Sequence, residues 1–305
     1  MIPFVVRRAL LIVPTLFVIA TLTFFLVRLA PGGPFQSEKE IPKAALAQMQ
    51  RAYGLDQPLP VQYVRFVTHA AVGDFGPSYK YPQRQVRDII VEGFRVSAEL
   101  GGWALLLSVL LGVPLGVIAA VKQNQLADHA AMTLALAGVS IPNFVLGPAL
   151  VLVFSLGLYW LPPALWTGPS SRVLPVLTLS VAYVAYIARL TRAGMLEVLR
   201  ADFVRTARAK GLQEWAVIVH HALRNALIPV VTLVGLQAAF LLGGAVVTET
   251  MFSWPGVGRL AVGAITTSDY PVAQGAIMLL AMAFLAINLL VDVLYVVLDP
   301  RVQRH

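Results

Sequence analysis

The 305 residues of this chain include no cysteine, and charged side chains are scarce. Without cysteine there is no disulfide framework, no thiolate metal site and no cysteine nucleophile. Asp, Glu, Lys and Arg make up 12% of the residues, about half of the share in an ordinary soluble domain. This low charge, together with 58% hydrophobic residues, argues against a soluble globular protein and indicates a protein of the membrane.

Motifs for phosphate transfer and for catalysis are also missing. A phosphate-binding P-loop needs Lys followed by Ser or Thr, whereas the five lysines here are followed by Glu, Ala, Tyr, Gln and Gly. His220 and His221 lie outside any HExxH motif, and no stretch long and apolar enough to span a membrane contains paired carboxylates. We therefore predict that the chain is not an enzyme, with no catalytic residue, no metal site and no cofactor of its own.

The sequence does contain long uncharged runs, and crossing a bilayer takes about 20 helical residues. The first run, residues 9–27, follows Arg7 and Arg8 but exceeds the apolar core of a signal peptide, so we expect it to be retained. Turn residues and aromatics fill the second half of the run 130–171, which we interpret as one span followed by a surface loop. The sequence thus predicts an all-α integral membrane protein with six transmembrane helices. The other four runs are 100–121, 173–188, 225–248 and 271–291.

Lysine and arginine are unequally distributed over the segments between these runs. Six spans place both termini on one side, and the segments on that side hold 12 of these residues, whereas the two short loops opposite hold only Arg172 and Arg259. Such an excess marks the cytoplasmic side of a multi-pass protein, so both termini are predicted to be cytoplasmic. The net charge of +8 follows from this topology, and no nucleic acid is expected as a partner.

Small residues recur at a spacing of four within the second run, at Gly112, Gly116 and Ala120. This spacing places them on one helix face, where a neighbouring helix can approach backbone to backbone. We expect close helix packing there.

The longest segment on the predicted cytoplasmic side, 189–223, contains a predicted helix over 197–210. Arg208 and Lys210 fall in its last turn, where cations complement the helix dipole, and Gly211 can take the left-handed conformation that ends a helix. Its apolar stripe consists of Phe203, Val204 and Ala207. Such a helix can insert into a groove of a partner protein or rest on anionic lipid headgroups, and the residues alone favour neither.

Eight short stretches are spread nearly from end to end of the chain. They are 28–35 (RLAPGGPF), 54–63 (GLDQPLPVQY), 73–78 (GDFGPS), 140–144 (SIPNF), 205–212 (RTARAKGL), 221–229 (HALRNALIP), 255–258 (PGVG) and 292–301 (DVLYVVLDPR). Together they resemble the membrane permease subunits of ATP-binding-cassette (ABC) importers for dipeptides and oligopeptides. The first and third stretches are more similar to the oligopeptide branch.

The resemblance implies a type I ABC importer permease fold in a bacterial inner membrane, with a long extracytoplasmic segment after the first helix. It implies three parts: 1–95, the first helix and this segment; 96–298, a five-helix core; and 299–305, a cytoplasmic tail.

The family also carries a cytoplasmic EAA motif, whose helix docks on an ATPase subunit. When the glycine of that motif is aligned with Gly211, Arg205, Thr206 and Ala207 take its three leading positions, so the Glu and the first Ala are replaced. The resemblance implies a coupling helix at about 197–211, with ATPase-coupling residues Asp202, Phe203, Arg205, Thr206, Ala207, Arg208, Lys210 and Gly211.

By the same resemblance, the chain is expected to form half of the translocation pathway of an ATP-driven peptide importer. Its partners would be a second, homologous permease, two ABC ATPase subunits that bind ATP and Mg, an extracytoplasmic peptide-binding protein and the lipid bilayer. We expect the pathway to be lined by weakly polar side chains, namely Ser140, Asn143, Tyr183 and Gln237. The alternatives are a secondary transporter or channel, which the scarcity of charge in the spans disfavours, and a membrane enzyme, which lacks a nucleophile or acid–base pair.

Overall fold

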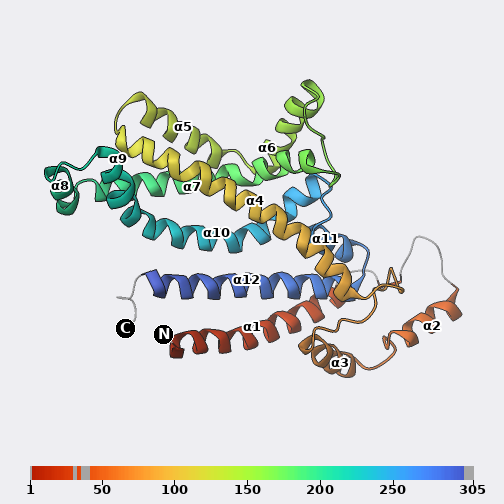
Figure 1. The fold of residues 1–305 in the computed structure, drawn as a ribbon. Helices are drawn as coiled ribbons and strands as arrows, with labels where there is room; N and C mark the ends of the chain where they lie inside the picture. The colour runs from red at the N-terminus through yellow and green to blue at the C-terminus, as the bar shows by residue number, and fades with distance from the viewer. Residues whose placement is uncertain (1, 30–32, 36–41, 299–305) are drawn as a thin grey trace. The chain divides into compact units, whose positions relative to one another are not determined.

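The computed structural model describes residues 2–29, 33–35 and 42–298, and within these ranges it forms helices and no β-strand (Figure 1). Five helical segments are long and apolar enough to cross a membrane, namely Val6–Leu29, Val86–Val121, Pro169–Val198, Glu214–Leu241 and Tyr270–Leu294. A bent pair of helices provides a sixth span when it is counted as one. The predicted all-α membrane fold is confirmed, while the predicted tail 299–305 lies outside the described residues.

The bent pair occupies most of the run 130–171. Helix α5 (Leu126–Ser140) is followed by α6 (Asn143–Leu150), which continues as the π-helical segment Val151–Gly157, and the two arms are bent by 105°. The break has a local cause, because Pro142 disfavours a helical conformation at the residue before it, and Ile141 is extended at φ −90° and ψ 115°. The span predicted for this run is therefore present as two helical arms, after which a loop runs to the next helix.

The chain divides into two compact units. Unit 1 consists of Ala98–Trp254 and the chain from Ala286, and unit 2 consists of Ile2–Ser97 and Pro255–Leu285. Unit 1 contains α5 and α6, most of α4 (Val86–Val121), α7 (Val173–Val198), α8 (Asp202–Ala209), α9 (Glu214–Ala216), α10 (Arg224–Met251) and the end of α12 (Tyr270–Leu298). Unit 2 contains α1 (Ile2–Leu29), α2 (Lys43–Ala52), α3 (Leu59–Ala71), α11 (Val257–Thr266), the start of α4 and most of α12.

In unit 1 the small residues of α4 lie directly against α7. A Cβ atom on Gly116 would lie 2.5 Å from the carbonyl oxygen of Ala188, and one on Gly112 would lie 2.8 Å from the side chain of Ile187. Ala120, on the same face of α4, is buried. The predicted close approach of two helices at these small residues is confirmed.

A charged pair joins α5 to α7 in the same unit. The guanidinium of Arg192 donates from Nε and Nη2 to the two carboxylate oxygens of Asp128, at 2.6 and 2.7 Å. Asp128 also accepts a hydrogen bond from the backbone N–H of Asn124, and its side chain is 2% exposed. Loss of either partner would leave a buried charge alone, so this bidentate pair fixes how the two helices pack.

The core of unit 2 is built from three helices. Val86 and Ile90 of α4, Val257 and Ala261 of α11, and Ala273 of α12 belong to one cluster of buried apolar side chains. The hydroxyl of Ser97 accepts a hydrogen bond from the first backbone N–H of α11, that of Val257, at 2.9 Å. Phe75, in the loop after α3, packs against this core.

The Gly116 contact gives a test of the α4–α7 packing. We expect Gly116→Ala to destabilise the protein by about 1–3 kcal/mol, because the added methyl group overlaps a backbone carbonyl. Gly102→Ala in the same helix is the control: nothing lies within 4 Å of its Cβ position, and alanine favours a helix over glycine by about 0.5–1 kcal/mol. Thermal unfolding in detergent should therefore show opposite shifts, and equal shifts would contradict the packing described here.

Candidate functional site

The α8 loop, residues 199–215, follows the end of α7 in unit 1 (Figure 1). Helix α7 ends at Val198, a turn follows in which the N–H of Ala201 donates to the carbonyl of Val198, and α8 begins at Asp202. The acidic side chain of Asp202 lies in the first turn, where it complements the positive end of the helix dipole. The single helix predicted over 197–210 is therefore corrected to the end of α7, a turn and the separate helix α8.

The end of α8 is set by Gly211. This residue has φ +77°, its N–H donates to the carbonyl of Arg208 at 2.9 Å, and the N–H of Leu212 donates to Ala207 at 3.4 Å. These two bonds form a Schellman motif, which requires a left-handed residue at this position. The prediction that Gly211 takes the left-handed conformation at the end of the helix is confirmed.

The apolar stripe of α8 does not face outward as a whole. Val204 is fully buried and Ala207 is 5% exposed, and both pack with Val198 and Val217 of the same unit. Only Phe203 is exposed, at 46%. Of the predicted apolar stripe, Val204 and Ala207 therefore support the loop from inside and Phe203 alone is exposed, while the assignment of coupling residues stays a prediction.

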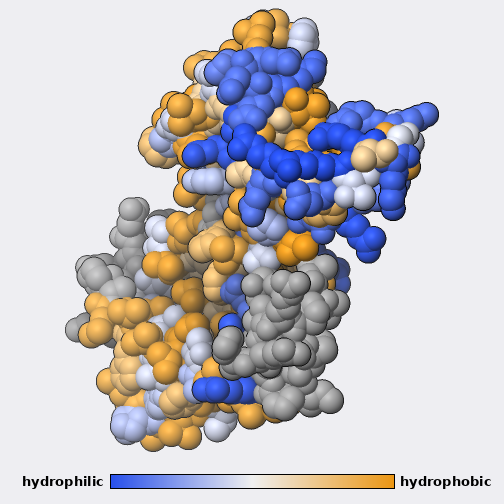
Figure 2. Space-filling model, turned by 90° about the vertical axis from the view of Figure 1, so that its left-hand side faces the viewer, coloured by the Kyte–Doolittle hydropathy of each residue, from blue (hydrophilic) through white to orange (hydrophobic). Residues whose placement is uncertain are grey.

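The outer face of α8 is polar, and Figure 2, viewed from the side on which α8 lies, shows hydrophilic residues gathered over this part of unit 1. Arg208 donates two hydrogen bonds to Glu214, at 2.7 and 3.1 Å, which tie α8 to the start of α9. Arg205 forms a longer ion pair with Asp202 at 3.4 Å. Seven of the eight predicted coupling residues are exposed, namely Asp202, Phe203, Arg205, Thr206, Arg208, Lys210 and Gly211.

The four predicted pathway residues lie on four helices of unit 1. Ser140 and Asn143 flank the bend between α5 and α6, and the hydroxyl of Ser140 donates back to the carbonyl of Leu136. Tyr183 is half-buried in α7, and Gln237 is buried in α10. No hydrogen bond described for these side chains joins them to one another, so their assignment to a pathway stays a prediction.

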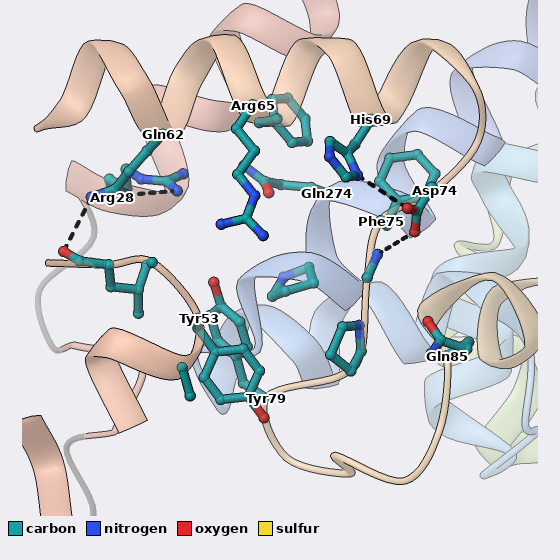
Figure 3. Close-up of a pocket in the computed structure, with 17 residues that line it drawn as sticks. Arg28, Tyr53, Gln62, Arg65, His69, Asp74, Phe75, Tyr79, Gln85 and Gln274 are labelled. Atoms are coloured by element: carbon teal, nitrogen blue, oxygen red, sulfur yellow. Dashed lines mark hydrogen bonds and ion pairs between the residues drawn. The ribbon is translucent and has the colours of Figure 1, made fainter. Parts of the chain in front are cut away.

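Unit 2 contains a pocket of about 410 Å³ (Figure 3). This volume is within the range of small-molecule sites, about 300–1,000 Å³. Its walls come from the end of α1, the α2–α3 turn, α3, the loop after α3 and the start of α12. The polar and aromatic side chains in the walls are Arg28, Tyr53, Gln62, Arg65, His69, Asp74, Phe75, Tyr79, Gln85 and Gln274.

A network of hydrogen bonds holds the loop after α3 against the start of α12. Asp269, just before α12, accepts hydrogen bonds from the Ser78 hydroxyl and from the backbone N–H of Tyr79, the latter at 3.1 Å. The Ser78 hydroxyl in turn accepts the backbone N–H groups of Lys80 and Tyr81, at 3.1 and 2.9 Å. Ser78 and Asp269 are both buried, so this hydrogen-bond network fixes where the Tyr79 ring enters the pocket.

Two guanidinium groups give the pocket its positive charge. Arg28 donates from Nη1 to the carbonyl of Phe24 at 3.1 Å and from Nη2 to Gln62 Oε1 at 3.3 Å, with its guanidinium carbon 3.5 Å from the centre of the Phe24 ring. Figure 3 shows Arg65 reaching from α3 into the space near the Tyr53 and Tyr79 rings. Among the described residues, the Arg65 guanidinium has neither an ion pair nor a hydrogen bond.

The carboxylate of Asp74, which lines the pocket, already has hydrogen-bond partners within the protein. Asp74 Oδ1 accepts the backbone N–H of Gly76 at 2.9 Å, and Oδ2 lies 3.0 Å from His69 Nδ1. The hydrogen bond from Gly76, reinforced by the one from His69, lowers the pKa of Asp74 below its usual range. Burial raises the pKa of Tyr79 to about 12, so its phenol is neutral and adds no negative charge. The lining therefore carries one ionised, hydrogen-bonded carboxylate, that of Asp74, and the two guanidinium groups of Arg28 and Arg65.

The sequence did not single out this pocket, although a signal was present. The stretches 28–35, 54–63 and 73–78, chosen for their family resemblance, all supply lining residues. Arg65 and Gln274 lie outside these stretches and were missed. The pocket forms from segments up to about 250 residues apart in the sequence. Hydrophobic periodicity and uncharged runs are local patterns, and they do not predict which distant segments come together.

Two family profiles match the chain. Residues 112–304 match "Binding-protein-dependent transport system inner membrane component", and residues 1–96 match the N-terminal profile of such membrane components. Both profiles describe membrane components of the same class of transport systems.

Individual relatives agree with the profiles. The chain is 44% identical to the oligopeptide transport system permease protein OppB of Escherichia coli K12, over 99% of this chain and 100% of that protein. It is 43% identical to the dipeptide transport system permease protein DppB of Bacillus subtilis 168, over 99% and 98%. The fold resembles a chain of the inward-facing MetNI methionine ABC transporter, with a TM-score of 0.58, 17% identity and coverage of 69% of this chain and 96% of that one. The fold is thus that of type I ABC importer permeases.

The end of α8 yields a prediction with a built-in control. Gly211→Val forces a β-branched residue into a left-handed conformation, which costs about 1–2 kcal/mol, and nothing within 4 Å adds a clash. Gly168→Val is matched, because Gly168 also has open space around it but has an extended φ of 174°. We expect amide hydrogen exchange over 202–212 to speed up by roughly 5–30-fold in Gly211→Val alone. Unchanged exchange would contradict the role given to Gly211.

Proposed function

We propose a function on the premise that the chain belongs to the family of binding-protein-dependent transport system inner membrane components. It is the membrane permease subunit of an ABC importer for peptides, and it forms half of the translocation pathway. The observation that carries this conclusion is the end-to-end match, at 44% identity, to a permease protein of an oligopeptide transport system. The match covers both units of the chain.

ATP chemistry belongs to partner subunits in this proposal. The chain has no P-loop, and its described residues hold no group of three His, Cys, Asp or Glu side chains suited to a metal ion. ATP and Mg would bind to two ABC ATPase subunits. A second, homologous permease and an extracytoplasmic peptide-binding protein complete the assembly, in a bacterial inner membrane.

The outer face of α8 is the proposed contact with an ATPase subunit. It offers one exposed aromatic side chain, Phe203, among charged residues, and such anchors carry much of the energy of protein interfaces. The buried side chains Val204 and Ala207 hold α8 on its own unit, so a push on Phe203 or Arg205 would be passed to α7 and the π-helical segment Val217–Leu223. This arrangement supports a coupling role over about 197–211.

The proposed topology places α8 and both termini in the cytoplasm and the segment from about 30 to 95 outside. Its support is the Lys/Arg excess on the α8 side of the spans. In this proposal residues 1–95 comprise the first helix and the extracytoplasmic segment, 96–298 the five-helix core and 299–305 a cytoplasmic tail. Ser140, Asn143, Tyr183 and Gln237 line the peptide path.

Reconstitution tests the function and the coupling role together. In proteoliposomes with its partners, the chain should support ATP-driven peptide uptake, and uptake should cease when the chain is omitted. Phe203→Ala should lower ATPase association by roughly fivefold or more and lower uptake with it. Phe17→Ala is the control, since Phe17 is similarly exposed, at 52%, on the first span. Full uptake and ATPase content in Phe203→Ala would instead favour an α8 that rests on lipid.

Cysteine labelling tests the topology on a clean background, because the chain has no cysteine of its own. Gln57 and Gln213 are both exposed, one in the α2–α3 turn and one in the α8 loop. A membrane-impermeant thiol reagent should modify Gln57→Cys in intact cells and should reach Gln213→Cys only after the membrane is opened. The reverse pattern would overturn the proposed orientation.

A further inference from the structure

The pocket of unit 2 is chemically unlike the rest of this apolar chain. Arg28 and Arg65 enter it, the side chain of Asp74 is held by Gly76 and His69, and the phenol of Tyr79 is neutral. The two guanidinium groups outnumber the single carboxylate of the lining, that of Asp74, so a ligand that enters meets a net positive charge. Guanidinium groups bind carboxylates well, because their N–H groups match the two oxygens.

A second, independent feature points to a polar ligand. Gln274, at the start of α12, is 4% exposed and lines the pocket, and its Nε2 has no hydrogen-bond partner among the described residues. An unpaired buried donor costs about 1–3 kcal/mol, so an acceptor brought by a ligand would remove this penalty. Gln274 and Arg65 line the same pocket, so a ligand within it can approach both.

Some N–H groups of Arg28 already donate hydrogen bonds within the protein, and these bonds fix the orientation of its guanidinium. Two of its five N–H groups bond to Phe24 and to Gln62, and the guanidinium lies over the Phe24 ring. The remaining donors are held in place before a ligand binds. Arg65, by contrast, is exposed and has the freedom to close onto a ligand.

The size and the walls of the pocket exclude a bare small anion as its best occupant. About 410 Å³ is far more than a carboxylate group fills, and the walls include Phe66, Phe75 and the Tyr53 ring. Gln85 adds an amide group that suits a peptide bond, whereas the amide of Gln62 is taken up by Leu55, Gln57 and Arg28. We infer that this pocket binds the free C-terminal carboxylate of a short peptide through Arg65, Arg28 and Gln274. The inference rests on the proposed function for its choice of a peptide.

Direct binding tests the inference. The full-length chain, in nanodiscs with its permease and ATPase partners and without a binding protein, is titrated with trialanine and with trialanine amide in a calorimeter. The amide keeps the peptide body but loses the carboxylate charge, so it should bind at least about tenfold more weakly. Arg65→Gln should weaken trialanine binding by a similar factor and abolish the preference for the free acid, while Arg65→Lys should keep part of it.

Two further variants separate charge from position and from folding. Arg51→Gln removes the same charge from an exposed site on α2 that does not line the pocket, and it should bind trialanine like the parent chain. Gln274→Leu removes the unpaired amide and should weaken trialanine binding by about fivefold without lowering thermal stability. Equal binding of acid and amide, no detectable trialanine binding, or equal losses in Arg51→Gln and Arg65→Gln would each overturn the inference.

Uptake by the same complex, with its binding protein added, keeps this inference distinct from the proposed function. Peptide uptake by the parent complex combined with equal acid and amide binding overturns the carboxylate site and leaves the importer standing. A clear preference for the acid in a complex that imports no peptide leaves the carboxylate site standing and overturns the proposed function.

Discussion

A backbone N–H or C=O group that lacks a partner in hydrocarbon costs several kcal/mol, and no water is present there to supply one. This constraint explains why the described residues form helices, and it also governs the places where helices break. At the bend between α5 and α6, Ile141 still donates to Ala137, and the carbonyl of Pro142 accepts from Val145 and Leu146. The turn between α7 and α8 likewise keeps its bonds. Irregular backbone at these two places therefore occurs where its N–H and C=O groups find partners within the chain.

The same constraint acts on buried polar side chains, which therefore occur in pairs. These pairs fix how the segments that carry them pack against one another. Asp128 and Arg192 join α5 to α7, Glu99 and Arg172 join α4 to the start of α7, and Ser78 and Asp269 tie a loop to α12. Each pair joins segments distant in sequence within one unit. Apolar contacts alone would leave helices free to slide in lipid, because lipid tails offer similar contacts. The pairs and the close contact at Gly116 fix one arrangement.

The sequence predicted the features that depend on local pattern. The uncharged runs predicted the membrane spans, and the spacing of small residues predicted a close helix contact, which is the one between α4 and α7. Gly211 predicted where α8 ends. The sequence could not predict which side of α8 is buried, because that depends on Val217, which packs there only after the chain has turned back. The pocket was missed for the same reason, since Arg65 and Gln274 meet only through tertiary structure. The break at 199–201 was missed as well, because Ala201 is extended, at φ −71° and ψ 149°, within a stretch whose local pattern favoured a helix.

Where a buried polar atom stays without a partner, the fold carries a cost that another molecule can remove. In unit 2 this atom is Nε2 of Gln274, in a pocket with two arginines. In unit 1 the corresponding amide is Gln237, whose Oε1 is buried in α10 without a partner among the described residues. Serine and threonine hydroxyls within helices commonly turn to a carbonyl of the preceding turn, as Ser140 does, but a glutamine amide has no such local solution. Gln237 thus belongs, with the hydroxyls of Ser155, Thr191 and Thr248, to the buried polar groups of unit 1 without a partner among the described residues, whereas the hydroxyl of Ser140 is already satisfied.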